Sequence, residues 1–149
     1  MRIAIAADHA AFALKQALAE WLRTSGHDVL DLGTDSDASV DYPDYGYKLA
    51  RAVADSTVDR GIALCGSGIG IAIAVNRDTQ CRCAHVSEPL SAALARSHND
   101  ANVIALGARL VGIDMAKACV EAFLTTDFLQ DRHSRRVAKL ATPDLDGDA

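Results

Sequence analysis

A cysteine followed by a glycine-rich turn is the feature of this chain with the clearest chemical potential. Cys65 ends the apolar segment 61–64, which predicts a buried strand, and glycines recur at every second position from Gly66 to Gly70. The apolar segment 71–76 that follows predicts a helix. Amides of such a turn can point at a ligand, and the helix N-terminus adds a positive dipole. This setting favours a thiolate at Cys65 and stabilises an oxyanion beside it.

The residues around this turn exclude several familiar glycine motifs. Gly70 is followed by Ile71-Ala72, so the lysine of a Walker-type phosphate loop is absent. The position two before Ser67 is a cysteine, which excludes a hydrolase nucleophile elbow. The G-x-G-x-G spacing misses the dinucleotide fingerprint, so a nicotinamide cofactor is disfavoured. The five histidines show no metal-ligand spacing, and we expect neither a metal nor a cofactor.

A dense basic cluster near the end of the chain is the second feature with chemical potential. It runs from Arg132 to Arg136 in a chain whose net charge is −5. Arg132 and Arg136 are four residues apart, so a helix would place both on one face. Two guanidinium groups on one face suit the binding of a phosphate. The alternative is a solvated helix face with no ligand.

Two further residues have an ambiguous setting. His98 lies at the end of a predicted helix, in Ser97-His98-Asn99-Asp100, where it is either a helix cap or a proton donor near a ligand. Arg109 is a lone charge in an apolar stretch, which indicates a buried or interface position.

Composition narrows the class of protein. The 149 residues suit one domain, 1–149, whose core must be aliphatic because half the residues are hydrophobic and only 5% are aromatic. The acidic balance argues against nucleic-acid binding, and no apolar run is long enough to cross a membrane. The N-terminus lacks the pattern of a secretory signal. These features predict a soluble, cytoplasmic protein.

Strand and helix patterns alternate along the chain. The predicted strands are 2–7, 28–32, 61–65, 81–86 and 103–106. The predicted helices are 12–24, 45–54, 71–76, 89–97, 114–124 and 132–140, with a loop at 33–44 and a flexible tail at 142–149. This order predicts an α/β fold with an open parallel sheet of about five strands and helices on both faces.

The predicted topology also suggests which residues meet. Ligands of such sheets bind beyond the carboxyl ends of the strands. Asp8-His9, the turn 65–70 and Ser87-Glu88 each follow a predicted strand, so they either converge at one edge or merely end their own strands. Cys81 and Cys83 lie two apart in a predicted strand, and with Cys119 we interpret them as small buried residues.

From Arg2 to about Leu140, the chain resembles the ribose-5-phosphate isomerase type B family, which is related to the galactose-6-phosphate isomerase subunits. The matching segments are Ala7-Asp8-His9, Asp41-Tyr42-Pro43, Cys65-Gly66-Ser67-Gly68-Ile69-Gly70, Ser87-Glu88-Pro89, 98–103, Gly107-Ala108-Arg109 and Arg132-His133. The resemblance implies a Rossmann-like three-layer α/β/α fold and an aldose–ketose isomerase, without cofactor, that interconverts ribose 5-phosphate and ribulose 5-phosphate. Cys65 places the chain in the branch that uses a cysteine rather than a glutamate as base.

The resemblance also assigns roles to individual residues. It makes Cys65 the base that moves a proton between C1 and C2, His98 the group that opens the sugar ring, and Ser67 a neighbour of the reacting oxygens. The turn from Gly66 to Gly70 becomes the anion hole for an enediolate. The implied substrate-binding residues are Asp8, His9, Tyr42, Gly66, Gly68, Ile69, Gly70, Asn99, Arg109, Arg132 and Arg136.

Assembly and substrate length remain open in this comparison. The resemblance implies a homodimer, possibly a tetramer, in which His98 and Arg109 reach the site from a second subunit. Relatives act on four-, five- and six-carbon sugars, so tetrulose phosphate, allose 6-phosphate and galactose 6-phosphate are alternative substrates. A non-catalytic sugar-phosphate-binding subunit is another alternative, although the presence of both Cys65 and His98 argues against it.

Overall fold

A parallel five-stranded sheet forms the centre of the protein. The computed structural model describes residues 1–143. The strands are β1 (Arg2–Ala7), β2 (Asp28–Asp31), β3 (Arg60–Cys65), β4 (Cys83–His85) and β5 (Val103–Gly107). Their order in the sheet is β2-β1-β3-β5-β4, and every neighbouring pair is parallel. The predicted α/β class and the five parallel strands are therefore confirmed.

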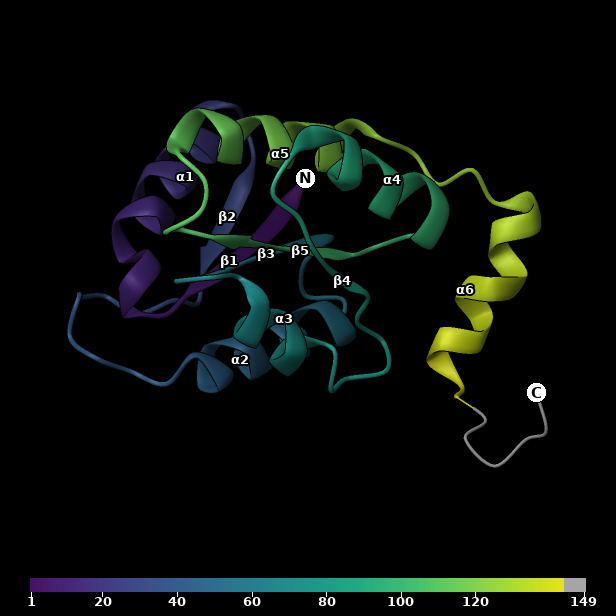
Figure 1. Ribbon diagram of the computed structural model, residues 1–149, viewed down its shortest axis with the longest axis horizontal. Coiled ribbons are helices and arrows are strands. Elements are labelled where there is room, and N and C mark those ends of the chain that lie inside the picture. The colour runs from purple at the N-terminus through teal and green to yellow at the C-terminus, as the bar shows by residue number, and fades with distance from the viewer. Residues whose placement is uncertain (144–149) are drawn as a thin grey trace.

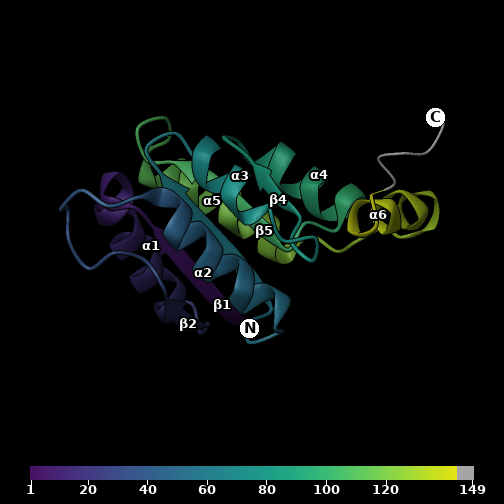
Figure 2. The same ribbon diagram turned by 90° about the horizontal axis from the view of Figure 1, so that it is seen from below.

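Helices cover both faces of the sheet (Figures 1 and 2). The helices are α1 (Phe12–Thr24), α2 (Tyr42–Ala54), α3 (Ile69–Val75), α4 (Pro89–Asn99), α5 (Ile113–Thr125) and α6 (Ser134–Ala141), with short 3-10 turns η1 (His9–Ala11) and η2 (Asp131–His133). Helices α1, α4 and α5 lie on one face, and α2 and α3 lie on the other. This arrangement is the expected three-layer architecture.

Two hydrophobic clusters hold the layers together, because successive side chains of a strand point to opposite faces. In β1, Ile3 and Ile5 pack under α1 and α5, whereas Ala4 and Ala6 pack under α2 and α3. The small side chains on the second face allow helices to approach closely. Helices α2 and α3 also approach each other closely, because a Cβ at Gly46 of α2 would lie 2.7 Å from the Cβ of Ala74 of α3.

The strand order reverses direction between β1 and β3. The chain moves from β1 outward to β2, then returns to β3 on the other side of β1 and continues toward β5 and β4. A parallel sheet has a crevice at such a switch point, outside the carboxyl ends of the two strands. Asp8 and Cys65 lie at these two strand ends, so the topology brings them to one place.

Helix α6 stands apart from the three layers. Both views show it beyond the β4 edge of the sheet, after an irregular segment that follows α5 (Figures 1 and 2). None of its residues is buried. The predicted helix 132–140 is therefore divided into η2 and α6, and most of the predicted tail, residues 144–149, lies outside the described residues.

Two predicted boundaries are wrong for identifiable reasons. Helix α2 begins at Tyr42 rather than at residue 45, because Pro43 occupies the first turn, where a proline needs no partner for its nitrogen. Strand β4 begins at Cys83, so Cys81 is outside it. The side chain of Asn76 bonds both the amide and the carbonyl of Cys83, at 2.8 and 2.9 Å, and Asn102 Oδ1 accepts the amide of Arg82. The side chain of Asn76 thus caps the free edge of β4, and that of Asn102 takes the amide of Arg82 just before the strand begins.

Candidate active site

A cavity of about 690 Å³ opens at the carboxyl ends of β1 and β3. This size lies within the range of small-molecule sites. The residues around it come from the ends of β1 and β3 and the turns that follow them, from α2 and α3, and from the loop after β5. They are Asp8, His9, Ala10, Tyr42, Cys65, Gly66, Ser67, Ile69, Gly70, Ile73, Arg109 and Leu110. Nine of the fourteen residues predicted for the site thus lie together.

The thiol of Cys65 is held by the turn that follows it. Cys65 is the last residue of β3 and is 4% exposed. The amide of Gly68 donates a hydrogen bond to its Sγ over 3.0 Å. A hydrogen bond from a fixed amide stabilises the charged form of a thiol. The Gly68 amide therefore serves the thiol, and Gly68 itself does not line the cavity.

Strand β5 fixes the shape of this turn. Gly68 has a positive φ of 79°, and a Cβ there would lie 2.8 Å from the backbone carbon of Leu106. A Cβ on Gly107 would lie 2.6 Å from the backbone oxygen of Ser67. The amide of Arg109 donates to the carbonyl of Gly66 over 3.0 Å, which ties the two loops together. The glycines are thus required by close backbone contact as well as by conformation.

Asp8 and His9, which follow the neighbouring strand β1, also line the cavity. Asp8 is 6% exposed, and its Oδ1 accepts the amide of Ala10 over 3.0 Å, which caps η1. The Nδ1 of His9 lies 3.2 Å from both the amide nitrogen and the carbonyl oxygen of Val40. The amide of Val40 can therefore donate a hydrogen bond to Nδ1, or its carbonyl can accept one from a protonated Nδ1. When the amide donates, the proton of a neutral ring is on Nε2, which is then a donor for a ligand.

Tyr42 and Arg109 complete the walls. A Cβ on Gly70 would lie 2.7 Å from ring atoms of Tyr42, so the ring lies directly on the first turn of α3. A Cβ on Gly66 would lie 3.4 Å from the guanidinium carbon of Arg109. Arg109 is exposed in the single chain, where the sequence indicated a buried or interface position. Its guanidinium group lies over the turn of its own chain.

The remaining predicted residues form a second group away from this cavity. His98 and Asn99 end α4, Arg132 is in η2, and Arg136 is in α6. The ring of His98 stacks on that of His133, with centroids 4.5 Å apart and planes 5° from parallel. Burial, together with the charges of His98, Arg132 and Arg136, lowers the pKa of His133. A single chain therefore does not bring its basic cluster to Cys65.

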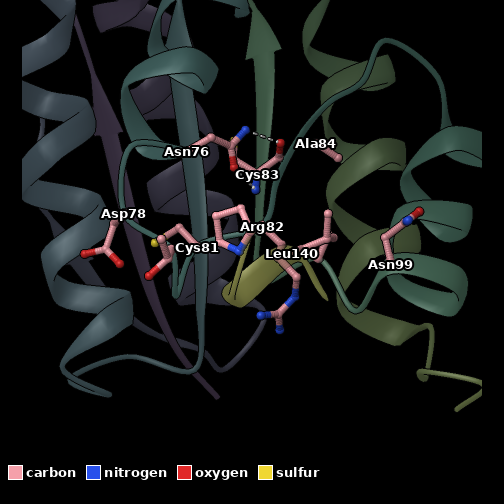
Figure 3. Close-up of a pocket in the computed structure, with 11 residues that line it drawn as sticks. Asn76, Asp78, Cys81, Arg82, Cys83, Ala84, Asn99 and Leu140 are labelled. Carbon is pink, nitrogen blue, oxygen red and sulfur yellow. Dashed lines mark hydrogen bonds between the residues drawn. The ribbon is translucent and has the colours of Figure 1, made fainter. Parts of the chain in front are cut away.

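A second cavity lies between the body of the protein and α6. Its volume is about 450 Å³, and Asn99 lines it together with Arg82 and Leu140 (Figure 3). Cys81 is at its border, where the thiol is 3.5 Å from the carbonyl of Ala50, and burial raises the pKa of Cys81 to about 11. Asn99, predicted as a substrate ligand, thus faces this cavity in the single chain. Cys81 is buried as predicted, and Cys83 is half-buried.

The segment Ser87-Glu88 does not join the cavity at β1 and β3. The carboxylate of Glu88 accepts the amides of Leu90 and Ser91, at 2.6 and 2.7 Å, and so caps α4. Hydrogen bonds from the side chain and amide of Ser91 lower the pKa of Glu88. Of the two outcomes that the sequence allowed for this segment, it ends its own strand and begins the next helix.

Sequence reasoning missed the apolar rim of the cavity. Ile73 and Leu110 line it and were not predicted, and with Ile69 each has a side chain more than half exposed. The spacing of Ile69 and Ile73 is a visible signal, because a helix places them on one face. Within residues 1–143, no cluster of metal-ligating side chains is present, and no helix is long and apolar enough to cross a membrane.

Comparison with known proteins gives a consistent result. Residues 3–140 match the family described as Ribose/Galactose Isomerase. Ribose-5-phosphate isomerase B of Escherichia coli K12 is 45% identical over 136 residues, which are 91% of each chain. D-erythrulose-4-phosphate isomerase of Pectobacterium atrosepticum is 40% identical over 94% of this chain and 93% of its own. The structure of ribose-5-phosphate isomerase B from Clostridium thermocellum superposes with a TM-score of 0.93, at 44% identity over 95% of both chains.

Proposed function

The chain belongs to the ribose/galactose isomerase family, and we propose that it interconverts ribose 5-phosphate and ribulose 5-phosphate by proton transfer through Cys65. The observation that supports this role is the Cys65 thiol, which receives the Gly68 amide at 3.0 Å and lines a cavity large enough for a sugar phosphate. The family match covers residues 3–140, which supports one isomerase domain over 1–149.

The chemistry requires a base beside stabilised oxygens. The thiolate of Cys65 takes the proton from C2 of the open aldose, and the electrons of that bond form an enediolate whose negative charge rests on oxygen. The thiol then returns a proton to C1, and the proton of the O2 hydroxyl passes to O1, so that C2 becomes the carbonyl carbon of the ketose. The Gly68 amide already donates to the thiol, so Ser67 and the other amides of the turn 66–70 are the donors for the enediolate oxygen. Removal of one such donor costs about 3 to 4 kcal/mol in comparable sites.

The phosphate requires cations beyond those of one cavity. In the single chain, His9 and Arg109 are the lining residues whose side chains can carry positive charge toward it. A phosphate dianion is bound best by several charged donors. We assign phosphate binding to Arg132 and Arg136, which reach the cavity of a second copy of the chain. His98 opens the sugar ring in that same cavity.

A homodimer with shared sites accounts for the separation of the two groups. The basic cluster lies outside the cavity of its own chain, and α6 stands away from the body, so both are available to a neighbour (Figure 1). Ile69, Ile73 and Leu110 leave an apolar rim that a partner would cover. The four thiols are free, as is usual for a cytoplasmic enzyme of pentose phosphate metabolism.

The direct test of the activity uses the cysteine. The parent protein is expected to convert ribose 5-phosphate to ribulose 5-phosphate. Cys65→Ala is expected to lower kcat by orders of magnitude while inorganic phosphate still inhibits binding of substrate, because a transition-state function is lost. Near-normal turnover by Cys65→Ala would remove the thiol from the mechanism without affecting the assignment of substrate.

Mixing two inactive variants tests the shared site. Cys65→Ala and His98→Asn are unfolded together and refolded as mixed dimers. If His98 acts in trans, half of the dimers are mixed and each has one complete site, which restores about a quarter of the parent activity. If both residues act within one chain, no mixed dimer has a complete site. Activity at the level of the separate variants would then refute the shared site.

A second substrate has a specific observation in its favour. A relative that is 40% identical over 93% of its length is named D-erythrulose-4-phosphate isomerase. Isomerisation of ribose 5-phosphate and of erythrulose 4-phosphate uses the same chemistry, because both reactions move a proton between neighbouring carbons of a sugar phosphate. Comparison of kcat/KM for ribose 5-phosphate, erythrulose 4-phosphate, allose 6-phosphate and galactose 6-phosphate separates these substrates. We expect the highest value for ribose 5-phosphate.

A further inference from the structure

One buried lysine has no part in the proton transfer just described. Lys15 lies in the first half of α1 and is 2% exposed. Its Nζ donates to Asp31 Oδ2 over 2.6 Å, and Asp31 is its one hydrogen-bond partner within residues 1–143. The ring of Phe12 lies 5.5 Å from the ammonium group. A lysine is rarely buried to this extent without a specific partner, so the pair requires an explanation.

Asp31 connects this lysine to the start of a loop. It is the last residue of β2, and its second oxygen, Oδ1, accepts the amide of Gly33 over 3.0 Å. The chain then lies directly on the lysine, because a Cβ at Gly33 would be 2.5 Å from Lys15 Cδ. The amide of Thr34 donates to the carbonyl of Ala7, at the end of β1. The pair therefore holds the loop against the strand that leads to Asp8.

The same loop holds His9 at its other end. Residues 35–39 are largely exposed, and the next residue, Val40, presents its amide and its carbonyl to Nδ1 of His9 at 3.2 Å. Immediately after Val40, the chain enters α2, whose first residue, Tyr42, lines the cavity. The loop thus has two attachments, one at the Lys15–Asp31 pair and one at His9 just before α2.

We propose that Lys15 and Asp31 are positioning residues for substrate phosphate, which set the loop 33–40 so that Val40 orients the ring of His9. The proposal rests on the proposed function, in which His9 binds the phosphate. Fold stability does not by itself explain the pair, because neutral or apolar replacement of a buried ion pair is frequently neutral or stabilising. The geometry instead gives the Lys15–Asp31 pair a role in the orientation of His9, whose ring nitrogen Nε2 then donates to the ligand.

A double-mutant cycle separates this role from a general structural one. The first change is Lys15→Met together with Asp31→Asn, which removes both charges, keeps similar volumes and retains an acceptor for Gly33. The second change is His9→Ala, and the third protein contains all three substitutions. KM for ribose 5-phosphate, kcat, and the dissociation constant of inorganic phosphate by calorimetry are measured for each protein.

The cycle has clear expected values. The pair variant is expected to raise KM and the phosphate dissociation constant about tenfold, with kcat changed by less than about twofold, and to add no further rise in the His9→Ala background. Equal rises with and without His9 would overturn the proposal, as would an unchanged KM in the pair variant. If the pair variant fails to fold, Asp31→Asn alone enters the cycle under the same criteria.

A control and an independent readout complete the test. Val120→Ala removes volume from the fully buried core of α5, so it lowers stability without touching the loop, and its KM is expected to equal that of the parent. A raised KM in this control would mean that lost stability alone explains the pair variant, which would overturn the proposal. Absence of turnover in the parent would instead refute the proposed function, while phosphate binding would still decide the role of the pair.

Discussion

Adding one methyl group at Gly68 should distort the turn that holds the reactive thiol. Gly68 has a φ of 79°, a region that costs an ordinary L-residue about 1 to 2 kcal/mol. A Cβ there would lie 2.7 Å from a ring carbon of His85, 2.8 Å from the backbone carbon of Leu106 and 2.9 Å from the amide nitrogen of Gly107. Two of these three atoms are backbone atoms of β5 and cannot rotate away.

The expected magnitude combines these two effects. Overpacking of a rigid site costs roughly 1 to 3 kcal/mol, so Gly68→Ala is expected to lower the free energy of unfolding by roughly 2 to 5 kcal/mol. The relaxed turn also moves the amide that donates to Cys65 Sγ. A hydrogen bond to a charged group contributes about 1.5 to 3 kcal/mol, which corresponds to a loss of roughly 10- to 100-fold in kcat.

Gly26→Ala is a matched control for the first effect. Gly26 has a φ of 85°, after the end of α1, and a Cβ there would meet no atom within 4 Å. It is expected to lose only the conformational part, about 1 to 2 kcal/mol, and to retain the parent kcat. Urea unfolding gives the two free energies, and appearance of ribulose 5-phosphate gives kcat. Equal losses of stability in both variants, with kcat intact at Gly68→Ala, would refute the reasoning about the turn.

Three other predictions concern the thiols, the basic cluster and acid. Iodoacetamide at pH 8 should alkylate Cys65 first, because burial raises the pKa of Cys81 to about 11 and also raises the pKa values of Cys83 and Cys119. Ribose 5-phosphate should protect Cys65 from this reaction. Mass spectrometry that finds a different cysteine alkylated first would contradict the prediction. Arg132→Ala should raise KM and weaken inhibition by phosphate roughly 10- to 100-fold at similar kcat, and unchanged values would make the cluster a solvated surface. Because the pKa of His133 is lowered in the folded protein, the stability that it contributes is complete above about pH 6.5 and is lost as the pH falls below this value. The stack of His133 on His98 should therefore open in acid, and a protease should cleave the segment from residue 131 faster at pH 5 than at pH 7.5. Equal rates of cleavage at the two pH values would exclude this.

The alternation of strand and helix patterns along the chain was sufficient to predict the layers of the fold. In β1 and β3, side chains of both faces are buried, so each strand reads as a continuous apolar run. The turn after Cys65 was equally visible, because its glycines are required by local conformation and by contact with β5. The start of α2 was misjudged, because Pro43 indicates either a loop or the first turn of a helix, and the neighbouring sequence does not distinguish them.

Residues that depend on distant partners gave no local signal. Lys15 looks like an ordinary residue of an amphipathic helix, and its burial depends on Asp31, 16 residues away, and on the absence of a side chain at Gly33. The short β4 likewise depends on the side chains of Asn76, which caps its free edge, and of Asn102, which accepts the amide of Arg82. Pattern reasoning reads neighbours along the chain, whereas these interactions arise only after the sheet has formed.

The division of the predicted site has a different cause. The order of parallel strands requires Asp8 and Cys65 to meet, because both follow strands that are neighbours in the sheet. No such rule applies to Arg132, which lies in η2, between the irregular segment after α5 and α6. The phosphate that Arg132 binds can lie in the cavity of its own chain or in that of a partner chain, and the sequence motif is the same in both cases. The recovery of activity in mixed dimers of Cys65→Ala and His98→Asn is therefore the measurement that the sequence cannot replace, because it alone reports which copy supplies each half of the site.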